Sequence, residues 1–155
     1  VDLETGGGCF TTIYFAELWD CDHTLVEENP DGVGQDIAGM VAMADMFRAG
    51  IDDAREQLVK WKEQVASVFA DVELLALPTL PIFPPHLDAL AGDPMELIIE
   101  ISRYTSVFNA AGTPATAQPI AAAGSPIPTS LQLVGPAGSE ELLLATAKAV
   151  EAANA

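Results

Sequence analysis

The chain has few basic residues. Its 155 residues include 6 lysines and arginines against 23 aspartates and glutamates, which gives a formal net charge of −17 at pH 7. Lysine and arginine supply most of the attraction of proteins to nucleic acids and to anionic lipids, so this balance disfavours both as partners. The simplest interpretation of the acidic excess is that the net charge keeps the protein soluble.

Cysteines and long apolar runs are also scarce. Cys9 and Cys21 are the two thiols, and no basic and apolar signal segment precedes them, which predicts a reduced, cytoplasmic protein. No apolar run approaches the roughly 20 residues that cross a bilayer, so no membrane partner is expected. Cys21 and His23 lie close in sequence, but a zinc site needs four ligands, and we expect neither a metal nor an organic cofactor.

The composition is that of a globular protein. Half of the residues are apolar and 19% are charged, and the length suits one unit with a sizeable core. Residues 1–70 are expected to be mainly helical, and residues 71–155 to combine helices with strands. Residues 1–8 contain three consecutive glycines and are predicted to form either a flexible lead-in or a connection to a part of the chain upstream.

Three helices are expected in the first segment. The spacing of apolar residues predicts one helix over residues 10–19 and a second over residues 35–49, whose methionines are assigned to the core. The clearest helix begins at Asp52, because apolar residues recur at spacings of four and three while charged residues lie off that stripe. The stripe consists of Ala54, Leu58, Trp61, Val65 and Val68.

The second segment begins with a strand and a proline-rich loop. Residues 72–77 form an apolar run, as expected of a strand covered on both faces. Five of the eleven prolines lie between residues 78 and 94, which predicts a rigid surface loop. Helical spacing returns over residues 95–109, and Gly112 is expected to end that helix.

The end of the chain is predicted to hold two more strands and a helix. Residues 115–121 and 129–134 are strand candidates, and the short segment between them favours an antiparallel pair. Ser139 is expected to cap the last helix, which has two glutamates in its first turn.

Three polar residues are candidates for a substrate pocket. Thr79 follows a strand, at the end of a sheet where α/β proteins bind ligands. Asn109 lies at the end of a helix, where a role in a tight turn is favoured over contact with substrate. Gln132 lies within an apolar strand, so if it is buried it needs hydrogen-bond partners, and a structural role is favoured over a pocket role.

The order of motifs in the second segment resembles the carboxyl-terminal portion of amidase-signature hydrolases. Residues 75–81 read Leu-Ala-Leu-Pro-Thr-Leu-Pro, residues 105–115 contain Asn-Ala-Ala-Gly-Thr-Pro, and residues 128–135 read Pro-Thr-Ser-Leu-Gln-Leu-Val-Gly. The resemblance covers roughly the last 80 residues. It implies an α/β fold, α+β as a fragment, in which helices pack on a mixed sheet within a three-layer domain. The chain departs from the pattern at Ser130, where the family more commonly has glycine.

The resemblance also implies hydrolysis of linear carboxamides by two serines and a lysine. Such enzymes carry the serines in a Gly-Gly-Ser-Ser-Gly-Gly type of segment, and this chain has no adjacent serines. We therefore assign no catalytic residue, and in particular none among Ser102, Ser106, Ser125 and Ser130. The three lysines, Lys60, Lys62 and Lys148, are expected on solvated helix faces.

The sequence therefore predicts an inactive carboxyl-terminal fragment of an amidase, which contributes about three strands to a larger sheet. Its expected partners are a small-molecule amide, for the whole protein, and either a missing amino-terminal part or further copies of the chain. Two alternatives stay open. One is the catalytic subunit of a glutamine-dependent amidotransferase, and the other is a non-catalytic acidic module that binds a partner.

Overall fold

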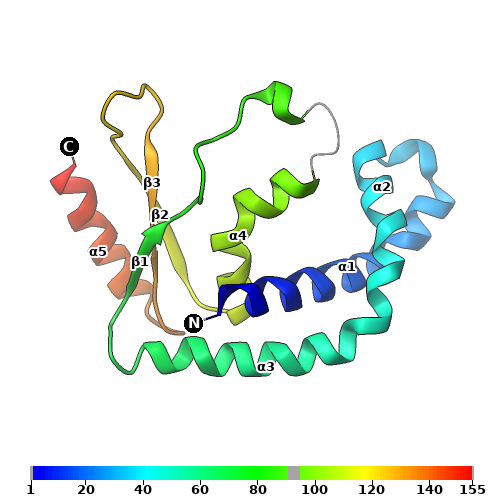
Figure 1. Cartoon of the computed structure of the whole chain (residues 1–155), viewed down its shortest axis with the longest axis horizontal. Coiled ribbons are helices and arrows are strands. Elements are labelled where there is room, and N and C mark those ends of the chain that lie inside the picture. The colour runs from blue at the N-terminus through cyan, green and yellow to red at the C-terminus, as the bar shows by residue number, and fades with distance from the viewer. Residues whose placement is uncertain (1, 91–94, 155) are drawn as a thin grey trace. The chain divides into compact units, whose positions relative to one another are not determined.

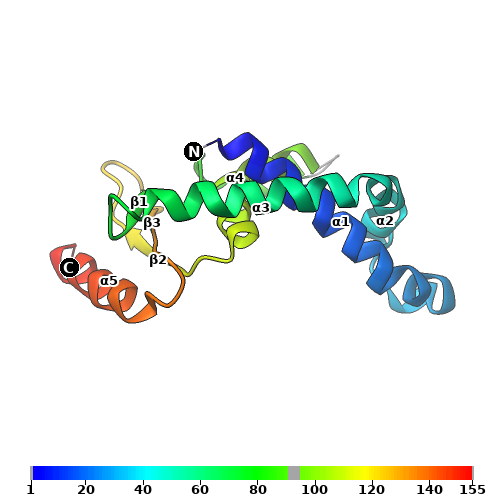
Figure 2. The same cartoon turned by 90° about the horizontal axis from the view of Figure 1, so that it is seen from below.

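The computed structural model describes residues 2–90 and 95–154 (Figures 1 and 2). The chain divides into two compact units, Asp2–Trp61 and Lys62–Ala155, and each unit is described by itself. The first is helical, and the second contains a three-stranded sheet.

Helix α1, Leu3–Glu28, takes up most of the segment expected to be a flexible lead-in, so that prediction was wrong. Two interactions explain the difference. The Asp2 carboxylate caps the helix by accepting hydrogen bonds from the backbone N–H groups of Glu4 and Thr5, at 3.1 and 3.4 Å. Gly6 is buried against the Trp61 indole, so this one glycine permits a close contact that helix propensity alone does not anticipate.

The rest of the first unit packs on α1. A 3-10 helix at Pro30–Gly32 leads to α2, Gln35–Ala44, and a second 3-10 helix, Asp45–Gly50, follows. The buried side of α2 is formed by Val41 and Ala44. The methionines do not form the core as expected, since Met43 and Met46 are 41% and 74% exposed. Met43 precedes Ala44 by one position, which turns its side chain by about 100° around α2 from the buried side. Met46 lies beyond α2, in the 3-10 helix that follows.

Helix α3, Ile51–Val68, has the predicted one-sided pattern. Its stripe positions are buried or half-buried, and Trp61 and Val65 are 0% and 2% exposed. The charged residues between them are exposed, including Lys60 and Lys62. The apolar period of the sequence therefore identified this helix and its buried side correctly.

The sheet consists of β1, Leu75–Pro78, β2, Ala115–Ile120, and β3, Thr129–Val134, in the order β1-β3-β2. The prediction of helices packed on a sheet is confirmed, as is the antiparallel pairing of β2 with β3. Every pairing among the described strands is antiparallel, so the parallel pairs of a mixed sheet do not occur in this part.

Strand β1 differs from its prediction. It begins at Leu75 rather than at residue 72, and its side chains alternate between half-buried and exposed instead of being covered on both faces. The reason is its position, because β1 is an outer strand of the described sheet and only β3 pairs with it. Its other edge carries backbone groups that no described strand satisfies.

Helices α4, Met95–Ala111, and α5, Glu140–Ala153, lie on opposite sides of the sheet, as Figures 1 and 2 show. Gly112 ends α4 as predicted, with a φ of +71°. The N–H groups of Gly112 and Thr113 donate to the carbonyl oxygens of Asn109 and Phe108, at 3.1 and 3.3 Å, which is the Schellman arrangement.

Ser139 occupies the N-cap position of α5, but its side chain makes no capping hydrogen bond, contrary to expectation. Its buried hydroxyl lies against Gly135, where an added Cβ would collide with it. The side chain is thus turned away from the free N–H groups of the first helical turn, and the acidic residues Glu140 and Glu141 remain as the stabilising feature of that end.

The proline-rich segment is a loop up to a 3-10 helix at Leu87–Leu90. The last part of the predicted loop, residues 91–94, lies outside the described residues.

Candidate functional site

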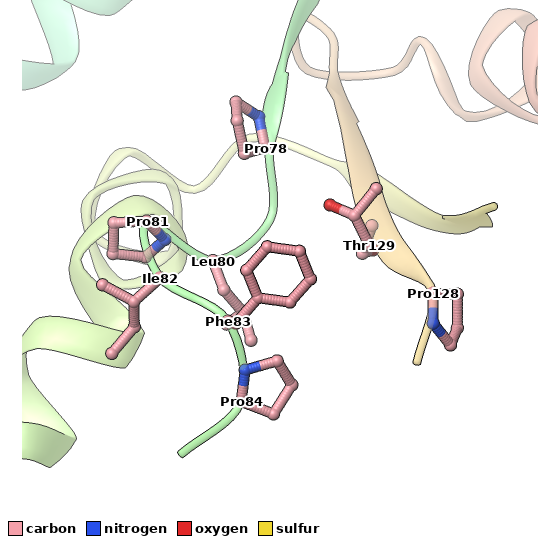
Figure 3. A pocket seen from close by; sticks show the side chains of 9 residues that line it. Pro78, Leu80, Pro81, Ile82, Phe83, Pro84, Pro128 and Thr129 are labelled. Carbon is pink, nitrogen blue, oxygen red and sulfur yellow. The ribbon is translucent and has the colours of Figure 1, made fainter. Parts of the chain in front are cut away.

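A pocket of about 350 Å³ lies where the end of β1 meets the beginning of β3 (Figure 3). The two strands are antiparallel, and Pro78 pairs with Leu131, so the exit of one strand lies beside the entrance of the other. The loop after β1 turns back to form one wall, and residues at the start of β3 form the other. The lining residues are Pro78, Leu80, Pro81, Ile82, Phe83, Pro84, Pro128, Thr129 and Ser130.

The walls of this pocket are apolar and stiff. Four of the lining residues are prolines, and two of them, Pro81 and Pro84, lie in the loop after β1. The proline ring fixes φ, so this loop has few backbone conformations to lose when a ligand binds. The Phe83 ring is directed from the loop toward β3 in Figure 3. Thr129 and Ser130 supply the polar side chains, both uncharged. The site is therefore suited to an apolar group and a neutral hydrogen bond.

Thr79, the first of the sequence candidates, lies next to this pocket through Ser130. The two hydroxyl oxygens are 2.7 Å apart, and the backbone N–H of Thr79 donates to the Ser130 carbonyl oxygen at 2.9 Å. Ser130 lines the pocket, whereas Thr79 is its hydrogen-bond partner. The two residues are 51 positions apart in sequence, so no local pattern could have paired them.

Gln132 is two residues farther along β3 and 4% exposed. Its Nε2 donates to the backbone carbonyl oxygen of Tyr104 in α4, at 3.0 Å. Alternate residues of a strand share a face, so Gln132 and Ser130 lie on the side of the sheet that α4 covers. This hydrogen bond is the structural role that the sequence favoured, and Gln132 is not among the residues that line the pocket.

Asn109 belongs to the last turn of α4 and is exposed. Its carbonyl oxygen accepts the hydrogen bond from Gly112, and the left-handed backbone position of the turn is taken by Gly112 itself. The structure thus brings Thr79 to the pocket through Ser130 and leaves Asn109 outside its lining. Pocket roles for Thr79, Asn109 and Gln132 stay predictions.

The three lysines and Ser102 lie outside the lining of this pocket. The three lysines, Lys60, Lys62 and Lys148, are exposed. The Ser102 hydroxyl donates to the Ile98 carbonyl oxygen of its own helix, at 2.7 Å. Across residues 2–90 and 95–154, no three histidine, cysteine or acidic side chains gather into a group that could hold a metal ion.

Cys9 is buried and His23 is held by neighbours on its own helix. Cys9 is 1% exposed, and burial raises the pKa of its thiol, which makes the thiolate scarce. His23 stacks on Trp19, and its Nδ1 lies 2.6 Å from the Trp19 carbonyl oxygen. That oxygen can only accept a hydrogen bond, so Nδ1 carries the proton.

Sequence reasoning missed Ser130, Phe83 and Pro128 as pocket residues. The sequence marks Ser130 only as a departure from a family pattern. The alternation of prolines with large apolar residues after β1 was available in the sequence, and it indicates a stiff apolar wall.

The family model for amidases matches residues 33–144. The chain belongs to the amidase family. The match includes β1, the proline-rich loop and β3, and therefore the whole pocket.

Curated relatives point to the same family. The chain is 31% identical over 153 residues to a glutamyl-tRNA(Gln) amidotransferase subunit from Halobacterium salinarum, a match that covers 95% of this chain and 34% of the relative. The corresponding protein from Streptococcus equi subsp. zooepidemicus, which has the same name, is 40% identical over 85 residues, which are 55% of this chain and 17% of the relative. The chain thus spans about a third or less of the length of these relatives.

Solved structures establish the fold. A crystal structure of an amidase superposes with a TM-score of 0.84 at 22% identity, covering 99% of this chain and 36% of that one. A Kluyveromyces lactis allophanate hydrolase gives a TM-score of 0.79, also at 22% identity, over 96% of this chain and 25% of that one. Within the described residues, none of the helices has the length and apolarity needed to span a membrane.

Proposed function

We propose that this chain is the carboxyl-terminal part of an amidase-signature hydrolase that cleaves the C–N bond of a linear carboxamide. The observation that carries the proposal is the amidase match over residues 33–144, in a chain about a third as long as its relatives. Open outer edges on β1 and β2 in the described sheet support it, because further strands could pair there. On this proposal, residues 1–70 and 71–155 are segments of one larger domain.

The chemistry would reside outside this chain. A serine oxygen of the remaining part attacks the amide carbonyl carbon, and a second serine and a lysine transfer the proton to the leaving nitrogen. The C–N bond breaks, ammonia leaves, and water hydrolyses the resulting ester. Backbone N–H groups stabilise the oxyanion. This chain contributes a wall of the substrate pocket and no catalytic residue.

The test compares two purified proteins, the 155-residue chain and the complete protein that we propose contains it. Release of ammonia from a panel of carboxamides is measured for both. We expect hydrolysis by the complete protein and none by the chain. Hydrolysis by the chain alone would contradict the proposal, and replacement of Lys60, Lys62 and Lys148 by alanine would then show whether a lysine takes part.

A second candidate is an amidotransferase that passes ammonia to a partner. It is supported by the 31% identity, over 95% of this chain, to a protein whose name describes it as part of a glutamyl-tRNA(Gln) amidotransferase. This function predicts a polypeptide that copurifies with the complete protein and receives the ammonia. We also propose a cytoplasmic location, which is supported by the two free cysteines.

A non-catalytic acidic module is the third possibility, supported by the net charge of −17. The exposed apolar side chains, among them Leu87 at 83% and Leu144 at 65%, support association of the isolated chain with itself or with the missing part. Light scattering distinguishes these states, because a compact monomer without dye-binding apolar surface would argue against the fragment hypothesis.

A further inference from the structure

The pocket between the proline-rich loop and β3 has a composition that restricts what it can bind. Its walls are four proline rings with Leu80, Ile82 and Phe83, and its polar side chains are two hydroxyl groups. None of the described residues that line it carries a charge. Its volume of about 350 Å³ lies at the lower end of the range for small-molecule sites, roughly 300–1,000 Å³.

Covering the apolar wall of the pocket would remove exposed apolar surface from water. Phe83 and Ile82 are 61% and 37% exposed although they are large and apolar. A ligand group that withdraws these side chains from water is favoured in proportion to the apolar area it removes. Prolines on both sides of Ile82 and Phe83, at Pro81 and Pro84, restrict the loop, so the wall is largely formed before binding.

The polar groups of the pocket favour a neutral ligand group. The hydroxyl groups that line it are those of Thr129 and Ser130. Ser130 also shares a hydrogen bond with Thr79, whose hydroxyl oxygen lies 2.7 Å away, so Ser130 keeps either its proton or a lone pair for a ligand. A charged ligand group would lose its hydration here without an opposite charge to replace it. The net charge of −17 further disfavours anionic ligands.

We infer that this pocket holds the acyl group of the carboxamide, and that this group is uncharged and apolar, either aromatic or branched aliphatic. The inference rests on the proposed amide hydrolysis and adds the substrate class to it. Glutamine, whose acyl group carries an ammonium and a carboxylate, is then a poor substrate. Phe83 determines specificity, and Ser130 positions the polar end of the group.

The test uses the complete protein and measures kcat/KM for acetamide, isobutyramide, benzamide and glutamine. We expect benzamide or isobutyramide to exceed acetamide at least about tenfold, and glutamine to be lowest, since one well-buried apolar group is worth roughly this factor. Phe83→Ala should lower the ratio of benzamide to acetamide about tenfold. Leu87→Ala is the matched control, because Leu87 is 83% exposed on the same segment and does not line the pocket, and it should leave the ratio unchanged.

Each outcome separates the two proposals. Hydrolysis of all amides at similar kcat/KM, or a ratio that Phe83→Ala does not change, overturns the inference and leaves amide hydrolysis standing. Glutamine as the best substrate also overturns it and favours the amidotransferase. If no amide is hydrolysed, the proposed function fails, and equilibrium binding of benzamide to the complete protein and to Phe83→Ala still tests the pocket. Equal affinity of the two proteins for benzamide, or no binding, would then refute it.

Discussion

The contact between Gly6 and Trp61 leads to a sharp prediction for the substitution Gly6→Ala. Gly6 is buried near the start of α1. A Cβ added there would lie 2.7 Å from Cε2 of the indole and 2.9 Å from Cδ2 and Cζ2. Carbon atoms in contact are normally about 3.5–4.0 Å apart, and Trp61 is fully buried, so the ring has little free space into which to move.

Two opposing effects determine the change in the free energy of unfolding. Alanine is a better helix former than glycine by about 1 kcal/mol. Insertion of a methyl group into a close-packed site costs about 1–3 kcal/mol. Gly8→Ala is the matched control, because the same helix accepts a Cβ at Gly8 with nothing within 4 Å. Gly8→Ala therefore gains helix propensity without a steric cost, and its free energy of unfolding should rise by about 0.5–1 kcal/mol.

Urea unfolding of the wild type and of each variant is monitored by tryptophan fluorescence at identical salt and pH, and the midpoints give the differences in the free energy of unfolding. We expect Gly6→Ala to be less stable than Gly8→Ala by about 1–3 kcal/mol, which is the steric cost alone. Gly7→Ala, also without neighbours within 4 Å, should behave like Gly8→Ala. If Gly6→Ala and Gly8→Ala unfold at the same midpoint, the reasoning about the close contact is refuted.

Three further predictions concern a hydrogen bond, the thiols and the charge. Gln132→Ala removes the hydrogen bond from the buried Gln132 to the Tyr104 carbonyl oxygen and should lower the free energy of unfolding in urea by about 1–3 kcal/mol. Gln118→Leu removes a buried oxygen without a partner in the described structure, so it should leave that free energy unchanged or raise it. Thiol reagents should modify the exposed Cys21 rapidly and the buried Cys9 only on unfolding, and equal reactivity of the two thiols would contradict this burial. Because burial raises the pKa of Cys9, the unfolded state loses the thiol proton first, so the free energy of unfolding should fall as pH rises above the ordinary thiol pKa. An increase in NaCl from about 0.05 to about 1 M should raise the melting temperature, since salt screens the repulsion within a chain of net charge −17, and a fall would contradict that account.

Local patterns were sufficient for much of the fold. The stripe of α3 was predicted because its apolar period reflects one buried side, and the end of α4 because glycine adopts the left-handed conformation at Gly112. The hairpin of β2 and β3 followed from a short connection. In each case, the residues that determine the structure lie within a few positions of one another.

Long-range contacts explain what the sequence did not predict. The start of α1 depends on Trp61, which is far from Gly6 along the chain. The pocket depends on the pairing of β1 with β3, and the hydroxyl pair on residues 51 positions apart. Thr79 was identified by its position after a strand, but its partner Ser130 could be recognised only once the register of the two strands was known.

The strand order β1-β3-β2 also has a consequence for biosynthesis. The middle strand is the last to be made, so β1 leaves the ribosome with neither of its edges paired to a described strand. The 51 residues that separate Thr79 from Ser130 take about 3–10 s to add at roughly 5–20 residues per second. During that interval the nascent β1 is an unpaired strand segment of the kind that chaperones protect from aggregation.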